Sequence, residues 1–258
     1  MADTQPCILY YDPRSICSSM VRYTLANAAS PLKGSLPLSV ELRPIDIVKG
    51  DQLSELYLCD INPKGQVPVL LSPAFLDRPI TDSLDITLWL CERYPDLRPV
   101  EHAEEINRLL RNLHAVNFFS LSMRNRPQRA ITQEQAIHAQ LNVPGLSDRH
   151  KKALEYKLEV TRAEKVGGAK PEVIQAEIER SRALLIEIDN TRKANNTTNS
   201  EDAWIFGTAA PTALDTTLVC FVARLMDVDL AELVPTTLLK LTQKKRNTPQ
   251  FKDIWTSL

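Results

Sequence analysis

The chain has 258 residues, of which 31 are Lys or Arg and 32 are Asp or Glu, so its net charge is −1. This length suits two small domains and can bury a large apolar core without disulfides or a structural metal. A nearly neutral chain has no overall electrostatic attraction for nucleic acid or for acidic membranes, so a small molecule is favoured as the ligand.

The cysteines favour a reducing compartment. They number five, are scattered and have no Cys-x-x-Cys spacing, which argues against a disulfide framework and against a zinc site. The first residues lack the basic flank and apolar core of a secretory signal, and no apolar run approaches the roughly 18 residues of a membrane span. We therefore expect a cytoplasmic protein.

The first predicted element is a strand over residues 7–11, a short apolar run of residue types that favour strands. Asp12-Pro13 ends it, because proline supplies no N–H to a ladder. From Ser18 onward apolar residues recur at helical spacing, so a helix is predicted to begin near residues 15–17. The free backbone N–H groups at this helix start favour an anion.

Two side chains at this helix start suit thiol chemistry. A thiolate is an anion, and a hydroxyl donor together with a helix N-terminus lowers the pKa of a thiol from its usual value of about 8.5. Ser15 is placed to be that donor, or it serves only as the helix N-cap. Cys17 is either a nucleophile that forms a mixed disulfide with the bound thiol or an inert thiol on the inner face of the helix.

A second turn lies at residues 62–68, where Asn62-Pro63 is followed by Gln66-Val67-Pro68. The apolar run after Pro68 is predicted to be a strand, since proline is tolerated at the first residue of an edge strand. A cis bond before Pro68 would make a fixed bend.

A helix is then predicted to begin at residues 81–83, with Ser83 as its N-cap or a first-turn residue. Its apolar positions Leu84, Leu88 and Cys91 share one face. The backbone N–H of Ser83 can bind a carboxylate. Asp82 either pairs with an α-amino group of the same ligand or only complements the helix dipole. Together the two turns can hold a peptide-like anion and its thiol.

The pattern becomes wholly helical after about residue 95. The Pro-rich stretch at residues 95–99 is typical of a linker. One amphipathic helix is predicted near residues 106–113, and another begins near Pro171. The alternation of strands and helices before residue 95 favours a βαβ unit followed by ββα, as in thioredoxin-like domains.

Several runs of this sequence resemble the glutathione transferases, and most closely their zeta class of maleylacetoacetate isomerase-like enzymes. Residues 14–22, Arg-Ser-Ile-Cys-Ser-Ser-Met-Val-Arg, look like the N-terminal motif of that class, and residues 61–70 resemble its Asn-Pro…Gln-Val-Pro loop. Residues 80–84 are similar to its Gln-Ser-Leu segment. In the C-terminal half, Thr212 and Asp215 resemble the buried capping box of the superfamily, which joins a helix cap to the third residue after it.

The resemblance covers residues 7–97 closely and 100–255 in outline, and it implies a fold. We expect a thioredoxin-like α/β domain with a four-stranded mixed sheet at residues 5–95, a linker at 96–101, and an all-α helical-bundle domain that binds the substrate at 102–258. It also implies a homodimer. The segment from about Thr132 to Asn199 departs most from the family and is expected to supply substrate-specific walls.

The resemblance further implies roles for individual residues. The catalytic hydroxyl falls on Ser15, with Cys17 as the other candidate for activating the thiol. The backbone of Val67, before the cis-proline position Pro68, would bond the cysteinyl part of glutathione, and Asp82-Ser83 would hold its γ-glutamyl part. The expected glutathione-binding residues are Arg14, Gln52, Gln66, Val67, Pro68, Asp82 and Ser83, with Gln52 at the glycyl carboxylate.

The motif departs from the zeta pattern at Ile16. Zeta enzymes carry two consecutive serines before the cysteine, so Ile16 replaces one candidate hydroxyl by an apolar group. The expected substrate pocket contains His114, Phe118 and Arg224. Arg224 corresponds to a zeta arginine that grips acidic substrates, while His114 either lines this pocket or belongs to the core.

Three functions remain open from the sequence. In the first, glutathione is the cosubstrate of a transferase that attacks a small hydrophobic electrophile, in detoxification or specialised metabolism. In the second, glutathione is the catalytic cofactor of a cis-trans double-bond isomerase like maleylacetoacetate isomerase. In the third, the chain is a binding protein on a transferase fold, without catalysis. None of the three requires a metal, a nucleic acid or a membrane.

Overall fold

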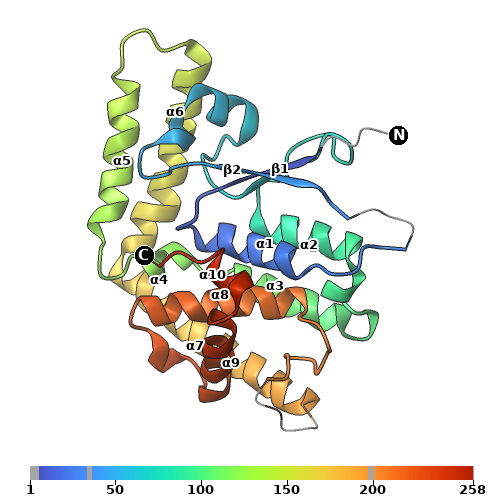
Figure 1. Ribbon diagram of the computed structural model, residues 1–258. Helices are drawn as coiled ribbons and strands as arrows, with labels where there is room; N and C mark the ends of the chain where they lie inside the picture. The colour runs from blue at the N-terminus through green and yellow to red at the C-terminus, as the bar shows by residue number, and fades with distance from the viewer. Residues whose placement is uncertain (1–5, 34–36, 197–199, 201, 258) are drawn as a thin grey trace. The chain divides into compact units, whose positions relative to one another are not determined.

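The computed structural model describes residues 6–33, 37–196, 200 and 202–257 (Figure 1). Contacts within this part of the chain divide it into two compact units. The first unit contains the residues up to Asp12 together with Ser39–Asp82 and Asn117–Glu177. The second contains Pro13–Leu38, Ser83–Val116 and the residues from Ile178 onward. These units differ from the expected domains at 5–95 and 102–258, which remain a prediction.

A small mixed sheet lies in the first unit. Its strands are β1 (Cys7–Tyr11), β2 (Val40–Pro44) and β3 (Val69–Leu71), in the order β2-β1-β3. β1 is parallel to β2 and antiparallel to β3. The predicted strands at residues 7–11 and after Pro68 are therefore confirmed, as is the mixed character of the sheet.

The expected number of four strands is wrong for the described residues, which form three. A single antiparallel bridge between Leu70 and Ile80, with two hydrogen bonds of 2.9 Å, stands where a fourth strand would lie. Pro79 precedes Ile80 and has no N–H to donate, and the next helix begins at Ser83. The chain therefore has room for one paired residue at this place.

A helical hairpin packs against the segment between β2 and β3 in the first unit. Helices α5 (Gln128–Leu141) and α6 (Asp148–Thr161) run antiparallel (Figure 1), and we call them the α5–α6 hairpin. Their apolar side chains Ile137, Leu154 and Leu158 form one buried cluster with Leu53 and Leu58. The other elements of this unit are η1 (Asp51–Leu53), η2 (Tyr57–Ile61), α4 (Phe118–Ser122), η5 (Arg162–Val166), η6 (Gly167–Ala169) and the start of α7 (Pro171–Asn195).

Helix α8 (Ala213–Asp227) is the centre of the second unit, since every residue from Ala213 to Leu225 is buried. Helix α1 (Ile16–Asn27) packs on it, and the buried hydroxyls of Thr24 and Thr216 form a 2.7 Å hydrogen bond between the two helices. The remaining elements are α2 (Ser83–Arg93), η3 (Pro95–Leu97), η4 (Val100–His102), α3 (Ala103–His114), the rest of α7, η7 (Ala231–Leu233), α9 (Thr236–Arg246) and α10 (Pro249–Lys252).

The predicted capping box at the start of α8 is confirmed. The hydroxyl oxygen of Thr212 accepts a hydrogen bond from the backbone N–H of Asp215, and the Asp215 carboxylate accepts one from the backbone N–H of Thr212 at 2.8 Å. The same carboxylate also accepts a 2.8 Å hydrogen bond from the backbone N–H of Ile205. Asp215 thus fixes both the helix start and the chain that leads to it.

The buried face of α2 differs from the predicted one. Cys91 is buried as expected, but Leu84 and Leu88 are only half-buried, while Ile86 and Leu90 are fully buried. The predicted buried face was wrong because the prediction followed the leucines. The buried face also includes the small residues Ser83 and Thr87. The helix predicted near residues 106–113 is confirmed as α3, and α7 begins at Pro171 as predicted.

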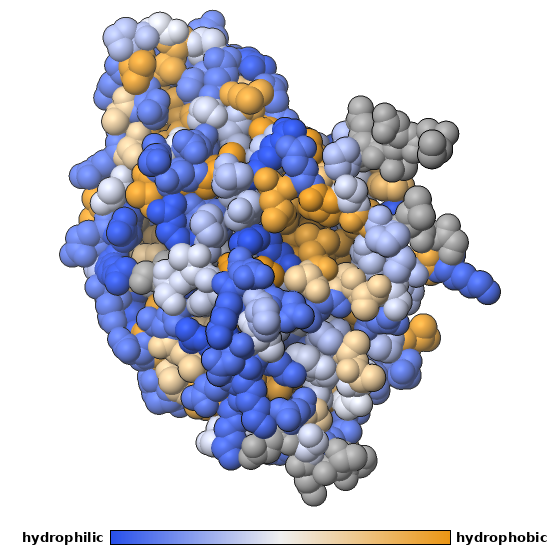
Figure 2. All heavy atoms as spheres, in the orientation of Figure 1, coloured by the Kyte–Doolittle hydropathy of each residue, from blue (hydrophilic) through white to orange (hydrophobic). Residues whose placement is uncertain are grey.

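The surface of the α5–α6 hairpin is mixed in character. Figure 2 shows hydrophobic groups scattered among hydrophilic ones on its visible side, and the exposed apolar side chains include Ile131 and Val143. Among the helices that the structure describes, none is long and apolar enough to cross a lipid bilayer.

Candidate functional site

The start of α1 lies where it was predicted, at residues 15–17. Ser15 is the N-cap, and its Oγ accepts a 3.3 Å hydrogen bond from the backbone N–H of Ser18. Ser15 and Cys17 are half-buried, whereas Ile16 between them is buried to 7 % exposure. Ser15 and Cys17 are therefore both partly exposed, and the apolar replacement at position 16 is part of the interior.

Arg224 of α8 supports the turn before Ser15. Its Nη2 donates a 3.0 Å hydrogen bond to the carbonyl oxygen of Arg14, and its guanidinium lies 5.0 Å from the centre of the Trp255 ring. Arg224 is only 2 % exposed, and its Nε has no partner among the described residues. Burial lowers the pKa of Arg224 to about 10, while the charges of Asp227 and of two cysteines, one of them Cys17, act in the opposite direction. The side chain is therefore a buried cation at neutral pH, held by a backbone carbonyl and an aromatic ring; its role in substrate binding stays a prediction.

Ser83 and His114 are brought together in the second unit. Ser83 is the first residue of α2 and is buried, and its Oγ lies 3.3 Å from Nδ1 of His114, the last residue of α3. The predicted position of Ser83 in the first turn of a helix is confirmed. Its hydroxyl is used within the fold, so the backbone N–H at the helix start is the group that remains for a ligand.

The turn before β3 is fixed by hydrogen bonds to one carbonyl. The Val67–Pro68 peptide bond is cis, as predicted. The carbonyl oxygen of Gln66 accepts hydrogen bonds from the hydroxyl of Tyr57 at 2.7 Å and from the side-chain amide of Asn62 at 2.9 Å. Within the described chain no residue forms a hydrogen bond with the backbone of Val67. This backbone is therefore available to pair with an extended peptide-like ligand.

The two glutamines of the predicted site are already engaged. The Gln66 side-chain amide donates a 2.5 Å hydrogen bond to the Glu164 carboxylate, and that of Gln52 donates one of 3.2 Å to the carbonyl oxygen of Ile47. An amide group has two N–H donors, so each glutamine has a second N–H beyond this bond. The Oε1 atom of Gln52 is buried and has no hydrogen-bond partner among the described residues.

The predicted residues divide evenly between the two units. Arg14, Ser15, Cys17, Ser83, His114 and Arg224 belong to the second unit, and Gln52, Gln66, Val67, Pro68, Asp82 and Phe118 to the first. Asp82 is exposed, and Phe118 is buried at the start of α4. Among the described residues no group of three or more His, Cys, Asp or Glu side chains could hold a metal ion.

Two residues that contact the turn of the predicted site were not predicted from the sequence. Lys157 of α6 donates a 2.7 Å hydrogen bond to the carbonyl oxygen of Lys64, and Glu164 accepts from Gln66 as described above. Both are about 100 positions away along the chain from the turn that they contact. No local pattern of residues signals a contact of this kind.

Comparison with known proteins gives a match for the N-terminal part of the chain. Residues 9–99 match the family described as "Glutathione S-transferase, N-terminal domain". No curated protein sequence matches the chain.

Solved structures give similarity over nearly the whole length. A glutathione transferase family member from Pseudomonas fluorescens with two glutathione bound is 16% identical over 98% of this chain and 93% of that one, with a TM-score of 0.62. A bacterial zeta-class glutathione S-transferase, maleyl pyruvate isomerase, is 21% identical over 96% of both chains, with a TM-score of 0.57. Ure2p in complex with glutathione is 14% identical over 98% of this chain and 100% of that one, with a TM-score of 0.59. At these identities the likeness shows the fold. The chain therefore has the glutathione transferase fold, and its residues 9–99 match the N-terminal domain family of the glutathione S-transferases.

Proposed function

We propose that this protein is a glutathione transferase that activates the thiol of glutathione for attack on a small hydrophobic electrophile. The observation that carries the proposal is the half-buried Ser15, whose hydroxyl lies at the N-terminus of α1. Its oxygen accepts from the backbone N–H of Ser18, so its own hydrogen is available to donate to a sulfur anion. The positive end of the helix favours the same charge.

The reaction that we propose needs little beyond this anion. The thiol loses its proton to solvent, and the thiolate attacks an electrophilic carbon to form a carbon–sulfur bond. In a substitution the displaced group leaves with its bonding electrons. In an addition the carbanion that results is protonated. Ser15 stabilises the thiolate by a hydrogen bond. Cys17 is the other candidate for handling the thiol, as a nucleophile that attacks a glutathionyl disulfide, forms a mixed disulfide with one glutathionyl sulfur and releases the other sulfur as a thiolate.

The remaining contacts of glutathione are assigned to the turn before β3 and to the start of α2. The backbone of Val67 pairs with the cysteinyl part, and the backbone N–H of Ser83, with Asp82, holds the γ-glutamyl part. Arg14, Gln52 and Gln66 supply donors to the carboxylates. Solved structures of the same fold were determined with glutathione bound, which supports this choice of cosubstrate.

Glutathione-dependent isomerisation is the second candidate. The zeta-like motif at residues 14–22 favours it, and one of the similar structures is a zeta-class isomerase. In that reaction the thiolate adds to a conjugated double bond, rotation follows, and elimination regenerates glutathione. A third candidate is glutathione binding without catalysis; the partly exposed Ser15 argues against it, because binding alone does not require a donor at the sulfur.

Mass spectrometry of glutathione and substrate together separates these functions. The purified protein is incubated with glutathione and a panel of electrophiles and conjugated cis-alkenes. Loss of glutathione with a matching adduct supports transfer, and turnover with glutathione unchanged supports isomerisation. Binding of glutathione without turnover of any substrate would favour the binding protein, and absence of glutathione binding would overturn the proposal.

We further propose a cytoplasmic homodimer, in keeping with the fold and with the five free thiols. Light scattering after gel filtration measures the mass in solution, and a value near that of one 29.1 kDa chain would contradict the dimer.

A further inference from the structure

The α5–α6 hairpin is attached to the segment that carries two proposed glutathione contacts. Gln52 lies in η1, and Gln66 lies in the turn before the cis-proline. Between them, Leu53 and Leu58 insert into the buried apolar cluster of the hairpin. The hairpin is thus packed onto this segment, and polar contacts at both ends of α6 add to the packing.

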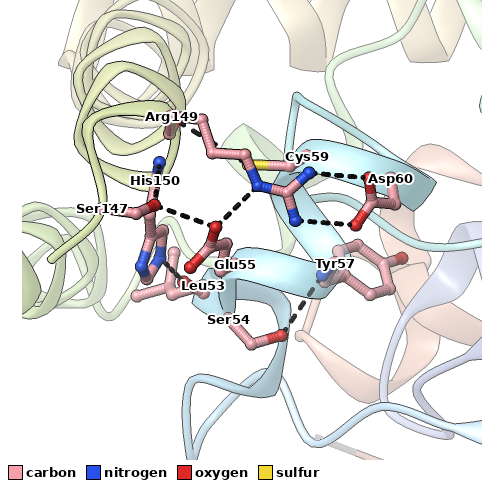
Figure 3. Close-up of polar contacts among 9 residues, drawn as sticks. All are labelled: Leu53, Ser54, Glu55, Tyr57, Cys59, Asp60, Ser147, Arg149 and His150. Atoms are coloured by element: carbon pink, nitrogen blue, oxygen red, sulfur yellow. Dashed lines mark hydrogen bonds and ion pairs between the residues drawn. The ribbon is translucent and has the colours of Figure 1, made fainter.

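At the start of α6 the ion pairs are exposed. Figure 3 shows the guanidinium of Arg149 between the carboxylates of Glu55 and Asp60, with distances of 2.6 Å and 3.1 Å. The neighbouring His150 is buried, and its Nε2 lies 2.8 Å from the carbonyl oxygen of Leu53. Solvent-exposed ion pairs contribute little to the stability of a fold, so the ion pairs of Arg149 add little to the stability of this contact.

At the end of α6 the contacts are buried and reach the turn itself. Lys157 is 6 % exposed, and its ammonium group donates to the carbonyl oxygen of Lys64 at 2.7 Å. Its methylene stem fills the space beside Gly65, which has a positive φ of 56° and is itself buried. A buried ammonium without an acceptor is costly, so this hydrogen bond ties the turn to α6 strongly.

Glu164 makes the second connection, immediately after α6. Its carboxylate accepts the 2.5 Å hydrogen bond from the side chain of Gln66, and its backbone carbonyl accepts one from the side chain of Asn117 at 3.4 Å. Tyr57 and Asn62 hold the carbonyl of the same Gln66 from within the N-terminal domain. Residues 64–66 are therefore held on both sides, directly before the Val67 backbone.

We propose that Lys157 and Glu164 are positioning residues, which hold residues 64–66 so that the backbone of Val67 and the side chain of Gln66 are pre-arranged for glutathione. This inference rests on the proposed function. The segment from about Thr132 to Asn199 was expected to form substrate walls. In this inference part of that segment supports the cosubstrate site instead. A pre-arranged loop binds its ligand more tightly because less conformational entropy is lost on binding.

Hydrogen exchange in the 258-residue chain tests the positioning without any ligand. The amides of Lys64 and Gly65 are hydrogen-bonded to Asn62, so opening of the turn is reported by their exchange. We expect Lys157→Met and Glu164→Ala each to speed exchange in peptides covering residues 62–68 by about tenfold or more. Glu164→Gln retains an acceptor for Gln66 and is expected to behave like the wild type. Arg149→Ala, at the exposed end of the same helix, is the matched control and should leave this exchange unchanged.

Glutathione binding by calorimetry and steady-state kinetics then tests the consequence. Lys157→Met and Glu164→Ala should weaken glutathione affinity roughly three- to tenfold and raise KM for glutathione with little change in kcat, since they act on binding and not on the sulfur. Unchanged exchange at residues 62–68 in both variants would overturn the inference, as would faster exchange with unaltered glutathione affinity. If the wild-type protein itself bound no glutathione, the proposed function would fail, and the exchange data would still decide whether Lys157 and Glu164 hold the turn.

Discussion

The ammonium group of Lys157 lies 2.7 Å from the carbonyl oxygen of Lys64, and it is buried. Burial, and then the charge of Lys165, lowers the pKa of Lys157 from 10.5 to about 8, while Glu164 opposes the shift. Between these two pH values the unfolded chain binds more protons at this position than the folded one. Titration of this group therefore increases the free energy of unfolding as the pH rises from 8 to 10.5.

Urea unfolding of the wild type and of Lys157→Met across this pH range measures the gain. The difference in unfolding free energy between the two should rise by about 1 to 3 kcal/mol between pH 8 and pH 10.5, in favour of the wild type, and should be constant below pH 7. Taking the difference cancels the contributions of the other lysines and of the tyrosines, because these groups titrate in both proteins. A flat difference over the whole range would show that Lys157 has an ordinary pKa.

Replacement of Ser15 separates helix capping from thiol activation. Ser15→Ala removes both the N-cap oxygen and the donor, and we expect a loss of about 1 kcal/mol in stability and of roughly 100-fold or more in kcat/KM. Ser15→Gly lowers stability by only a few tenths of a kcal/mol, so it should lose the activity while keeping most of the stability. The ultraviolet absorbance of bound glutathione against pH should show its thiol titrating at higher pH in both variants. A fully active Ser15→Ala protein together with an inactive Cys17→Ala protein would assign the chemistry to Cys17.

Arg224 is expected to affect the reactivity of Cys17 through its charge. Arg224→Met keeps the stem but leaves the Arg14 carbonyl without this donor, and a loss of about 2 to 3 kcal/mol in unfolding free energy is expected. Without the buried cation the thiolate form of Cys17 is less favoured, so alkylation of Cys17 by iodoacetamide at pH 7 should slow several-fold, measured by peptide mass spectrometry. Arg224→Lys keeps the charge and should keep most of the alkylation rate. Equal rates in the wild type and the Met variant would remove any electrostatic role of Arg224 at this helix start.

Asp215 should be one of the most sensitive positions for stability. Its carboxylate accepts from two backbone N–H groups and from the Thr212 hydroxyl at 2.7 Å, and Asp215→Ala leaves these buried donors unsatisfied. We expect a loss of about 3 kcal/mol or more in urea unfolding. Thr212→Ser retains the capping hydroxyl and should lose less than about 1 kcal/mol. Equal, small losses in the two variants would mean that the capping box contributes little.

The features that could be predicted from sequence are set by a few neighbouring residues. Asp12-Pro13 ends a strand and Ser15 caps a helix, and the structure has both within one residue of the expected places. The cis bond at Pro68 and the capping box of Thr212 also depend on short motifs, and both are present. Local backbone chemistry determines such features, so one sequence is enough to find them.

Of the features that were missed, two are local. The pairing at Ile80 is a single bridge because Pro79 precedes it and α2 begins at Ser83, and the buried face of α2 includes small polar residues that a count of leucines ignores. The others depend on contacts between distant residues. The docking of the α5–α6 hairpin onto residues 51–66 joins positions about 100 residues apart. No periodicity within either segment records that pairing.

The space beside Gly65 is filled by the stem of Lys157, whose Cδ and Cε would lie 3.1 Å from a Cβ built on the glycine. The same Cβ would also lie 3.0 Å from Cδ2 of Leu58, and the φ of 56° strains any residue with a side chain at this position. Shortening Lys157 alone therefore does not make a side chain acceptable at position 65. The glycine is required by its own backbone conformation as well as by the two side chains packed against it.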